Sequence, residues 1–323
     1  MGRVLITTRS VANCEKAVKL LQEEGHEVAV HIGKGNMGEE ELSEIIRGAD
    51  ALIVGVDSVT RQVIEAGMPE LKIIARNGVG YNNVDLACAM EHGLPVTIAP
   101  NASKVSVCEL ALGMMFASAR HMGRQDRELR NGNWERQMGF ELTGKTLGIL
   151  GGGNIGYEVA LRAIALGMKV LVYDKVKVQR IEALAGARYE ELPVLLSEAD
   201  ILSLHLPVTE STKGLVNKGF LDQVKPGAVL INTARGRLVE EQEIAKALKD
   251  GRLSCYATDT LTEEPASPDN PLLKLPNTII TPHCGAYTKE AVEGCGILVA
   301  EEVNRVLRGE KPLYQVEETG GEK

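Results

Sequence analysis

The chain has 323 residues, 44% of them hydrophobic and 25% charged, and its formal net charge is −8. This length suits about two domains, and the composition is that of an ordinary globular protein. The acidic balance and the lack of a long basic run argue against nucleic acid as the main partner, because phosphate contacts need clustered Lys and Arg.

The apolar segments are too short for export or membrane insertion. The N-terminal run is shorter than the core of a signal peptide, and residues 109–119, the longest apolar helix candidate, are too few to span a bilayer. The six cysteines show neither a CxxC pair nor metal-binding spacing, which is typical of small buried side chains in a reducing compartment. We therefore expect a cytoplasmic chain with no membrane partner.

Short β-branched segments alternate with helical patterns almost from end to end. A first series of strands is expected at 3–7, 27–30, 51–56, 72–76 and 95–99. A long apolar helix is expected at 106–122, and a second series of strands follows at 145–150, 169–174, 199–206 and 228–233. Near-continuous apolar strands separated by helices predict parallel sheets covered on both faces, so the two series predict two α/β domains.

A glycine-rich turn opens the second series. Gly151, Gly153 and Gly156 form a G-x-G-x-x-G pattern that follows one expected strand and begins a helix. The next strand ends at Asp174, with Lys175 directly after it. This is the context of a dinucleotide site, in which the pyrophosphate lies at the helix N-terminus and the carboxylate binds ribose hydroxyls. Because a carboxylate repels a 2′-phosphate, the pattern favours NAD.

Three kinds of chemistry-bearing side chain follow later strands of the same series. Arg235 comes just after the strand that ends at Thr233, although Arg237 is a rival that spacing does not exclude. The acidic segment at 259–264 comes next, and His283 follows another strand. An anchor for a carboxylate, a proton donor and a group that orients the donor are what carbonyl reduction requires.

At this point the sequence resembles the D-2-hydroxyacid dehydrogenase family, in its phosphoglycerate dehydrogenase-like branch. The similar stretches are LKIIARNGVGYNNVDL, the ELALGMM helix, GKTLGILGGGNIG, LHLPVTESTKGLVN, KPGAVLINTARGRLVEE, DTLTEEP and NTIITPHCGAYTKEA. Together they cover most of residues 50–310. One difference concerns the substrate: branches that bind phosphoglycerate tend to carry a basic residue just after the strand ALIV, where this chain has GVDSVTR, with Asp57 and the nearest cation at Arg61.

The resemblance implies a role for each candidate. It selects Arg235 over Arg237 as the catalytic arginine, Glu264 over Glu263 as the catalytic glutamate, and His283 as the catalytic histidine; no metal is implied. It adds the 77–80 loop, whose backbone N–H groups would bind the substrate carboxylate, and Asp259 beside the nicotinamide. The predicted substrate-binding set is Asn77, Gly78, Val79, Gly80, Arg235 and His283. The predicted cofactor-binding set is Val79, Gly151, Gly153, Asn154, Ile155, Gly156, Asp174, Leu206, Pro207, Thr212, Thr233, Ala234, Arg235, Asp259, His283 and Gly285.

The resemblance also implies an organisation and a reaction. Residues 1–99 and 287–323 would build a smaller, flavodoxin-like substrate domain, and residues 100–286 a Rossmann-type NAD-binding domain inserted in it. The expected function is NAD-dependent interconversion of a 2-hydroxy acid and its 2-oxo acid by a homodimer joined through the region after residue 102. Glyoxylate and hydroxypyruvate are plausible substrates beside phosphoglycerate. Two alternatives remain open, an NAD(H)-sensing corepressor-like binding protein and phosphite oxidation on the same fold.

Overall fold

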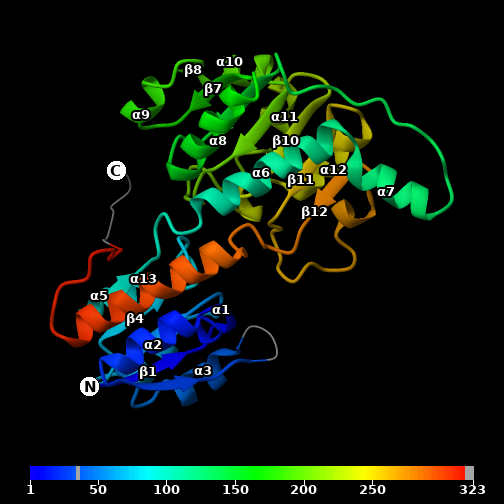
Figure 1. Cartoon of the computed structure of the whole chain (residues 1–323). Coiled ribbons are helices and arrows are strands. Elements are labelled where there is room, and N and C mark those ends of the chain that lie inside the picture. The colour runs from blue at the N-terminus through cyan, green and yellow to red at the C-terminus, as the bar shows by residue number, and fades with distance from the viewer. Residues whose placement is uncertain (34–36, 317–323) are drawn as a thin grey trace. The chain divides into compact units, whose positions relative to one another are not determined.

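The computed structural model describes residues 1–33 and 37–316. The chain divides into two compact units, one made of Met1–Ser103 together with the chain from Ala286 onward, the other of Lys104–Gly285. The colours of Figure 1 follow this division: blue, cyan and orange-red segments build the first unit, and green to orange segments build the second. The first unit is therefore assembled from two stretches of chain that lie far apart in the sequence.

The first unit contains a five-stranded parallel sheet. The strand order is β2-β1-β3-β4-β5, which is the flavodoxin-like order. Its strands are β1 (Arg3–Ile6), β2 (Glu27–Val30), β3 (Ala51–Val54), β4 (Ile73–Arg76) and β5 (Val96–Thr97). The central strand β3 is fully buried, because helices cover both faces of the sheet.

Helices from both ends of the chain cover this sheet. One face carries α3 (Glu39–Ile45), α4 (Arg61–Gly67) and α5 (Leu86–Glu91). The other carries α1 (Arg9–Ala12), α2 (Glu15–Glu23) and α13 (Lys289–Leu307). Figure 1 shows α13 beside α2, and the Asn304 side chain donates a hydrogen bond to the Leu20 carbonyl at 3.1 Å.

The second unit contains a seven-stranded parallel sheet in the order β12-β11-β10-β9-β6-β7-β8. Its strands are β6 (Thr146–Leu150), β7 (Lys169–Tyr173), β8 (Ala187–Tyr189), β9 (Ile201–Leu204), β10 (Ala228–Asn232), β11 (Leu253–Thr258) and β12 (Thr278–Ile280). The order reverses between β9 and β6, as in a Rossmann fold, and ligands of such sheets bind at the carboxyl ends beside that reversal.

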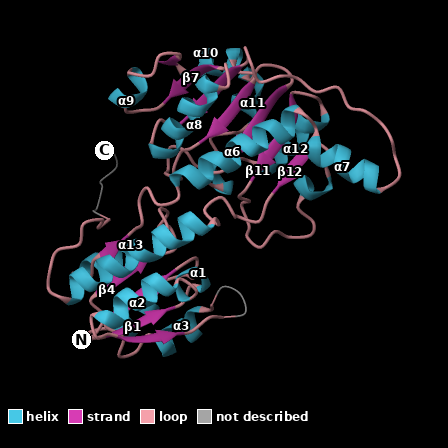
Figure 2. Cartoon of the chain, viewed as in Figure 1, coloured by secondary structure: helices cyan, strands magenta, loops and turns pink. Residues whose placement is uncertain are grey.

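Helices also cover both faces of the second sheet, as Figure 2 shows. One face is covered by α6 (Lys104–Ala119), α8 (Asn154–Ala165) and α9 (Gln179–Glu182). The other is covered by α10 (Leu192–Glu198), α11 (Lys218–Gln223) and α12 (Glu241–Lys249). Short 3-10 helices η1 (Gly236–Leu238) and η2 (Pro271–Lys274) lie in connecting loops, and α7 (Met122–Arg130) has no buried residue.

These two sheets confirm the predicted α/β class with doubly wound parallel topology. Two strands, β8 and β11, were not among those expected from the sequence. β8 has three partly or fully exposed residues, and β11 interrupts its apolar residues with Ser254. Among the described residues, no helix combines the length and the apolarity that crossing a membrane requires.

Candidate active site

The glycine turn between β6 and α8 needs two of its three motif glycines for purely structural reasons. Gly151 has φ +105°, and a Cβ there would lie 2.5 Å from the carbonyl oxygen of His205. A Cβ at Gly156 would lie 2.0 Å from the carbonyl oxygen of Gly151. These glycines let the backbone turn tightly and let α8 pack closely against the end of β6.

Gly153 is different, because the chain itself does not require a glycine there. Its φ is −63°, a value open to any residue, and no atom lies within 4 Å of the position a Cβ would take. This open space lies at the N-terminus of α8, where backbone N–H groups and the helix dipole favour an anion. The turn therefore fits the pyrophosphate of a dinucleotide, which needs close approach to the backbone at this position.

Asp174 follows β7 and supports the same turn. One of its carboxylate oxygens accepts a hydrogen bond from the Gly152 N–H at 2.6 Å, and the other accepts one from the Val176 N–H at 3.3 Å. The side chain of Asn154 accepts from the Arg180 guanidinium at 2.7 Å. These contacts hold a carboxylate beside the glycine turn, where the ribose of a bound dinucleotide would need it.

Arg235 lies just past β10 in a half-buried position. Its Nη1 donates to the Ala234 carbonyl at 2.7 Å, and the buried Asn232 side chain donates to the Arg235 carbonyl at 3.0 Å. Burial lowers the pKa of Arg235, and the charge of Glu264 opposes that shift. Arg237 is exposed, so the structure gives these two arginines different surroundings.

Glu264 and His283 form a direct pair at the carboxyl ends of β11 and β12. Nδ1 of His283 lies 2.7 Å from Oε2 of Glu264, while Oε1 of Glu264 accepts from the Leu261 N–H at 3.0 Å. Burial would raise the pKa of Glu264, but the hydrogen bonds from His283 and Leu261 and the charges of His283 and Arg235 hold it below its ordinary value. The pairing leaves Nε2 of His283 as the ring atom that can meet a substrate.

Asp259 fixes the turn that presents His283. Its buried carboxylate accepts hydrogen bonds from the Thr281 hydroxyl at 2.5 Å and from the N–H groups of Cys284 and Gly285 at 2.8 and 2.7 Å. The His283 N–H donates to the Asp259 carbonyl at 2.9 Å, and His283 has the uncommon φ of +50°. Asp259 thus has an observed structural role, and its contact with the nicotinamide stays a prediction.

Two further residues, which the sequence analysis did not single out, hold the loop that carries Glu264. A Cβ at Gly236 would lie 2.0 Å from the Leu261 carbonyl carbon, so the loop packs directly on this glycine. Glu241 accepts from the Thr262 N–H and from the Asn270 side chain, both at 2.7 Å. Glu241 follows the segment RGRLV by two residues. Nothing in the sequence singled it out, because acidic residues are common in the first turn of a helix.

The other predicted cofactor residues lie in loops at the same edge of the sheet. The Thr212 hydroxyl donates to the Pro207 carbonyl at 2.6 Å, which closes the loop after β9. Leu206 is partly buried against the core. The Thr233 hydroxyl is buried without a hydrogen-bond partner among the described residues, and Ala234 donates its N–H to Asn232. A buried hydroxyl without a partner suits a site that a polar ligand completes.

The predicted 77–80 loop follows β4 in the first unit. The N–H groups of Asn77 and Gly78 already donate to the carbonyls of Val54 and Arg76 at 2.8 and 2.9 Å. Within the described chain, this leaves the N–H groups of Val79 and Gly80 as the donors for a ligand. Asp57 is buried and accepts from the Thr7 hydroxyl and the Met37 N–H, both at 2.9 Å, so it serves the interior of this unit.

Comparison with known proteins bears directly on these two units. Residues 112–285 match the family described as D-isomer specific 2-hydroxyacid dehydrogenase, NAD binding domain. The chain is 39% identical over 313 residues to the hydroxypyruvate reductase of Thermotoga maritima, covering 95% of this chain and 99% of that one. The chain belongs to the D-isomer specific 2-hydroxyacid dehydrogenase family.

Other members of the family are similar in sequence and structure. The D-3-phosphoglycerate dehydrogenase of Methanocaldococcus jannaschii is 42% identical over 300 residues, which are 92% of this chain but 56% of the relative. The chain thus spans about half the length of the D-3-phosphoglycerate dehydrogenase that it matches. The crystal structure of the TT0316 protein of Thermus thermophilus superposes with a TM-score of 0.90 at 36% identity, covering 98% of this chain and all of that one.

Membership of the family establishes NAD as the cofactor. The matched region contains the glycine turn, Asp174 and the Arg235, Glu264 and His283 group. The open space at Gly153 and the orphaned Thr233 hydroxyl agree with a dinucleotide at this edge of the sheet. These are the observations by which the residues of this chain fit the cofactor.

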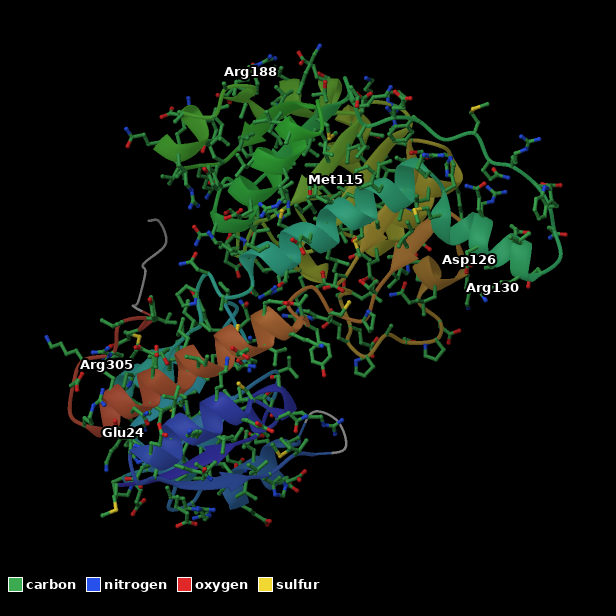
Figure 3. All side chains as sticks on the ribbon, viewed as in Figure 1. Glu24, Met115, Asp126, Arg130, Arg188 and Arg305 are labelled. Atoms are coloured by element: carbon green, nitrogen blue, oxygen red, sulfur yellow. The ribbon has the colours of Figure 1, made fainter. Side chains whose placement is uncertain are left out.

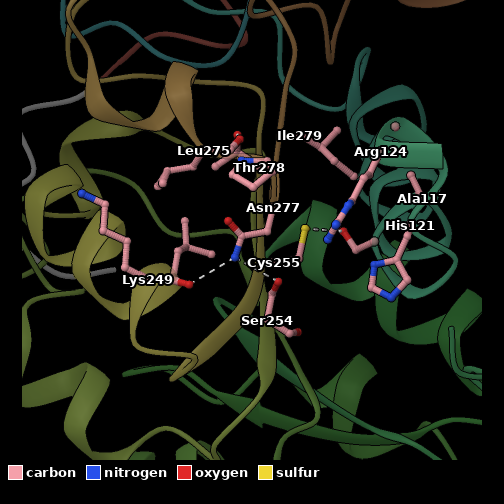
Figure 4. Close-up of a pocket in the computed structure, with 14 residues that line it drawn as sticks. Ala117, His121, Arg124, Lys249, Ser254, Cys255, Leu275, Asn277, Thr278 and Ile279 are labelled. Atoms are coloured by element: carbon pink, nitrogen blue, oxygen red, sulfur yellow. Dashed lines mark hydrogen bonds between the residues drawn. The ribbon is translucent and has the colours of Figure 1, made fainter. Parts of the chain in front are cut away.

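A separate cavity of about 420 Å³ lies at the opposite edge of the same sheet (Figure 4). Ser254 and Thr278, which line it, are at the amino ends of β11 and β12. Arg124 and Lys249 line it as well, and Asn277 crosses it to donate to the Leu248 and Ser254 carbonyls at 3.3 and 3.4 Å. Because Arg235, Glu264 and His283 follow the carboxyl ends of their strands, this cavity is not the candidate active site.

Proposed function

We propose that the chain is an NAD-dependent D-2-hydroxyacid dehydrogenase that interconverts a 2-hydroxy acid and its 2-oxo acid. The observation that carries this proposal is the 2.7 Å pair of His283 and Glu264 at the same sheet edge as the half-buried Arg235 and the glycine turn. A cation that can bind a carboxylate, a ring nitrogen that can transfer a proton and a carboxylate that orients the ring are together the groups that this reaction needs.

In the direction of reduction, Arg235 binds the substrate carboxylate and polarises the neighbouring 2-oxo group through its fixed guanidinium. Bound NADH supplies the hydride that goes to the carbonyl carbon. Nε2 of His283 gives a proton to the carbonyl oxygen, so the product is a hydroxyl group and the ring is left neutral. Glu264 holds Nδ1 of the ring and stabilises its protonated form by charge. Oxidation runs through the same groups in reverse.

The chain's own residues support a small substrate without a phosphate. Asp57 occupies the position after β3 and points its carboxylate to interior partners, so no cation is supplied from there. The relatives include proteins named hydroxypyruvate reductase and glyoxylate reductase. We therefore propose substrates of the glyoxylate and hydroxypyruvate type, with the N–H groups of Val79 and Gly80 as further donors to the carboxylate. Residues 1–99 and 287–323 would serve the substrate, and residues 100–286 the cofactor.

The assembly we propose is a homodimer joined through the region after residue 102. The segment that follows α6 carries large apolar side chains in water: Leu129 is 52% exposed, Trp134 83% and Met138 93%. On α7 itself, Asp126 and Arg130 form an ion pair along the helix (Figure 3). Exposed apolar groups of this size mark an interaction surface. Light scattering should give twice the mass of one chain.

The location that we propose is the cytoplasm, because the six free cysteines suit a reducing compartment.

The test is a steady-state assay with NADH against glyoxylate, hydroxypyruvate, pyruvate and 3-phosphohydroxypyruvate. We expect turnover of the first two to exceed that of the phosphorylated acid. Arg235→Lys keeps a charge but loses the planar fork, and it should lower kcat/KM by about 2–4 kcal/mol in transition-state free energy. Arg237→Lys is the matched control and should change it little. NADH binding without turnover of any acid would contradict the proposal and favour a sensor.

A further inference from the structure

A cluster of three potential metal ligands lies in the first unit, on helices that carry none of the residues proposed for catalysis. Within residues 1–33 and 37–316, Glu65, Cys88 and His92 are the group whose carboxylate, thiol and imidazole ligand atoms all lie within 4.8 Å of one another. Cys88 and His92 are four residues apart, in α5 and at its C-terminal cap, so they share one face of that helix. Glu65 comes from α4, which covers the same face of the sheet as α5.

The three side chains differ in burial in a way that suits a metal site at the protein surface. Cys88 is 0% exposed and packs in the apolar layer under α5, whereas Glu65 and His92 are exposed. Asp85 accepts the Cys88 N–H at 2.9 Å and fixes the start of the helix. The thiol is therefore held in place, and the other two ligands are free to adjust their rotamers around an ion above it.

The charges around the cluster leave Glu65 available. Arg61 forms two hydrogen bonds with Glu91, at 2.7 and 3.0 Å, and a longer one with Glu65 at 3.5 Å. The guanidinium is thus satisfied by Glu91, and releasing Glu65 costs little.

We propose that Glu65, Cys88 and His92 form a binding site for Zn²⁺, with water in the fourth position. Zinc takes sulfur, nitrogen and oxygen ligands in tetrahedral geometry, and three protein ligands leave one position open. Bond lengths of about 2.3 Å to sulfur and about 2.0 Å to nitrogen or oxygen bring ligand atoms to roughly 3.5 Å from one another. The ligand atoms already lie within 4.8 Å of one another, so rotamer adjustment of the two exposed side chains brings the cluster toward this geometry. The ion would tie α4 to α5 and stabilise the first unit by mass action.

The site is tested with the full chain after removal of metal by a chelator. Co²⁺ serves as the spectroscopic probe, because a cobalt–thiolate bond gives a near-ultraviolet charge-transfer band, and Zn²⁺ should abolish that band by displacing cobalt. We expect one Co²⁺ per chain with this band, and a rise in Tm on addition of Zn²⁺. Cys88→Ser should remove the band. His92→Gln, at an exposed position that the fold tolerates, should weaken Zn²⁺ binding at least tenfold, and Glu65→Gln should weaken it less.

Two matched controls separate this site from other ligands in the chain. His31→Gln removes an exposed histidine that lies 2.8 Å from Glu41 but has no thiol nearby, and it should leave the band intact. Cys284→Ser removes the thiol beside His283 and should also leave it intact. The proposal is overturned if the unaltered chain gives no cobalt–thiolate band, if the band survives in Cys88→Ser, if His92→Gln binds Zn²⁺ as tightly as the unaltered chain, or if Cys284→Ser alone removes the band. The test measures metal binding and Tm, so its result does not depend on whether the chain turns over a 2-oxo acid.

Discussion

Glu264 is held in its ionised form across the neutral pH range, since its pKa lies below the ordinary value. Its charge therefore faces Nδ1 of His283 whenever the substrate reaction runs. The proposed role of Glu264 is to stabilise the ring when Nε2 carries the proton that reduction consumes. A neutral amide of the same size could keep the contact but would remove the charge.

Glu264→Gln should therefore shift the pH dependence of catalysis. In reduction, the alkaline limb of kcat/KM should move to lower pH, because the protonated ring loses its stabilising charge. In oxidation, which needs the neutral ring, the acid limb should also move to lower pH. The measurement is a pair of pH–rate profiles in each direction with NAD(H) saturating. Limbs that stay in place would show that Glu264 does not govern the proton on His283.

The glycines of the turn after β6 separate folding from cofactor binding. Gly153→Ser places another residue suited to the N-cap of α8, and no neighbouring atom lies within 4 Å of its new Cβ. The urea midpoint of unfolding should therefore stay unchanged. The added side chain occupies the open space at the helix N-terminus, so the Kd for NADH should rise more than about tenfold, or 1.4 kcal/mol. Fluorescence titration with NADH measures it.

Gly156→Ala provides the contrast, because its Cβ would meet the Gly151 carbonyl oxygen at 2.0 Å. This variant should lose stability as well as NADH affinity. If Gly153→Ser bound NADH normally, the pyrophosphate would not lie over this position. If it lost stability like Gly156→Ala, the open space would have a structural role instead.

Some of these site residues could be predicted from the sequence, and others could not. The glycine spacing and Asp174 were enough to predict a dinucleotide turn, because that motif has a local cause in backbone geometry. The choice of Arg235 over Arg237 came only from the resemblance. The two arginines are two residues apart in the same loop, and the sequence does not show which of their side chains is buried. The Glu65, Cys88 and His92 cluster gave no signal, because the cysteines lack metal-binding spacing and Glu65 comes 23 residues before Cys88 in the chain.

At the scale of elements, the loop between β11 and η2 depends on α12. Glu241 in the first turn of α12 accepts hydrogen bonds from Thr262 and Asn270, and so holds the segment that carries Glu264. Glu241→Ala removes a charged acceptor from both donors. Each such bond contributes about 1.5–3 kcal/mol, and part of this loss should appear in the placement of Glu264.

We expect Glu241→Ala to lower kcat/KM for the 2-oxo acid by about tenfold, or 1.4 kcal/mol, with little change in the Kd for NADH. Glu243→Ala is the matched control, because Glu243 lies in the same helical turn and forms its ion pair within the helix, with the nearby Lys246. Steady-state kinetics and NADH titration of both variants decide the matter. Equal effects of the two variants would mean that only the charge of the helix terminus is involved.

The packing of α6 against α8 includes a nearly buried ion pair whose strength depends on pH. Glu158 is 8% exposed and contacts Lys104 at 2.7 Å and Arg162 at 2.6 Å. The hydrogen bonds from Lys104 and Arg162 lower the pKa of Glu158, against the effect of burial. A lowered pKa in the folded state means that the stabilisation is fully present above the unfolded value of about 4.3 and is lost as the pH falls through the folded value.

Glu158→Gln should therefore reduce the free energy of unfolding by about 2 kcal/mol near pH 7. The gap between the variant and the unaltered chain should close as the pH falls below about 4.3, because the carboxyl then becomes neutral as well. Urea unfolding at several pH values measures both. Glu109→Gln removes an exposed acid from α6, the helix that also carries Lys104, and should give the same free energy of unfolding as the unaltered chain at every pH. If the difference in free energy of unfolding between the variant and the unaltered chain persisted in acid, the cause would be packing and not charge.

Element prediction worked where strands were long, apolar and bounded by turns. Strands such as β3 and β10 are buried along their whole length, so the apolar run in the sequence reports them directly. β8 is a three-residue edge strand with an exposed centre, and its pairing with β7 comes from tertiary position. β11 was missed because Ser254 and the flanking Arg252 hide its apolar pattern.

At the scale of the whole molecule, both units use one plan, a parallel sheet with helices on each face. The strand orders identify one as flavodoxin-like and the other as Rossmann-type. The class and the two-series organisation followed from the alternation of strand and helix patterns alone. The strand order did not, because the sequence gives the succession of strands and not which of them pair.

The two-segment construction of the first unit has a consequence for protein synthesis. Val299 and Val303 of α13 are fully buried against the face of the sheet that also carries Val4 and Ile53. That face lacks this cover until the ribosome has made residues that come after the whole second unit. The second unit is continuous in sequence, so it is able to finish folding on the nascent chain first.

A chain released at residue 285 should accordingly contain a protease-resistant second unit beside a first unit that is readily digested. Adding the segment 286–316 as a separate peptide should restore protection of residues 1–103, since the peptide supplies the missing apolar face. Limited proteolysis followed by mass spectrometry distinguishes the two units. Equal resistance of both units in the truncated chain would show that the first unit folds without α13. The order of synthesis would then place no constraint on the folding of this chain.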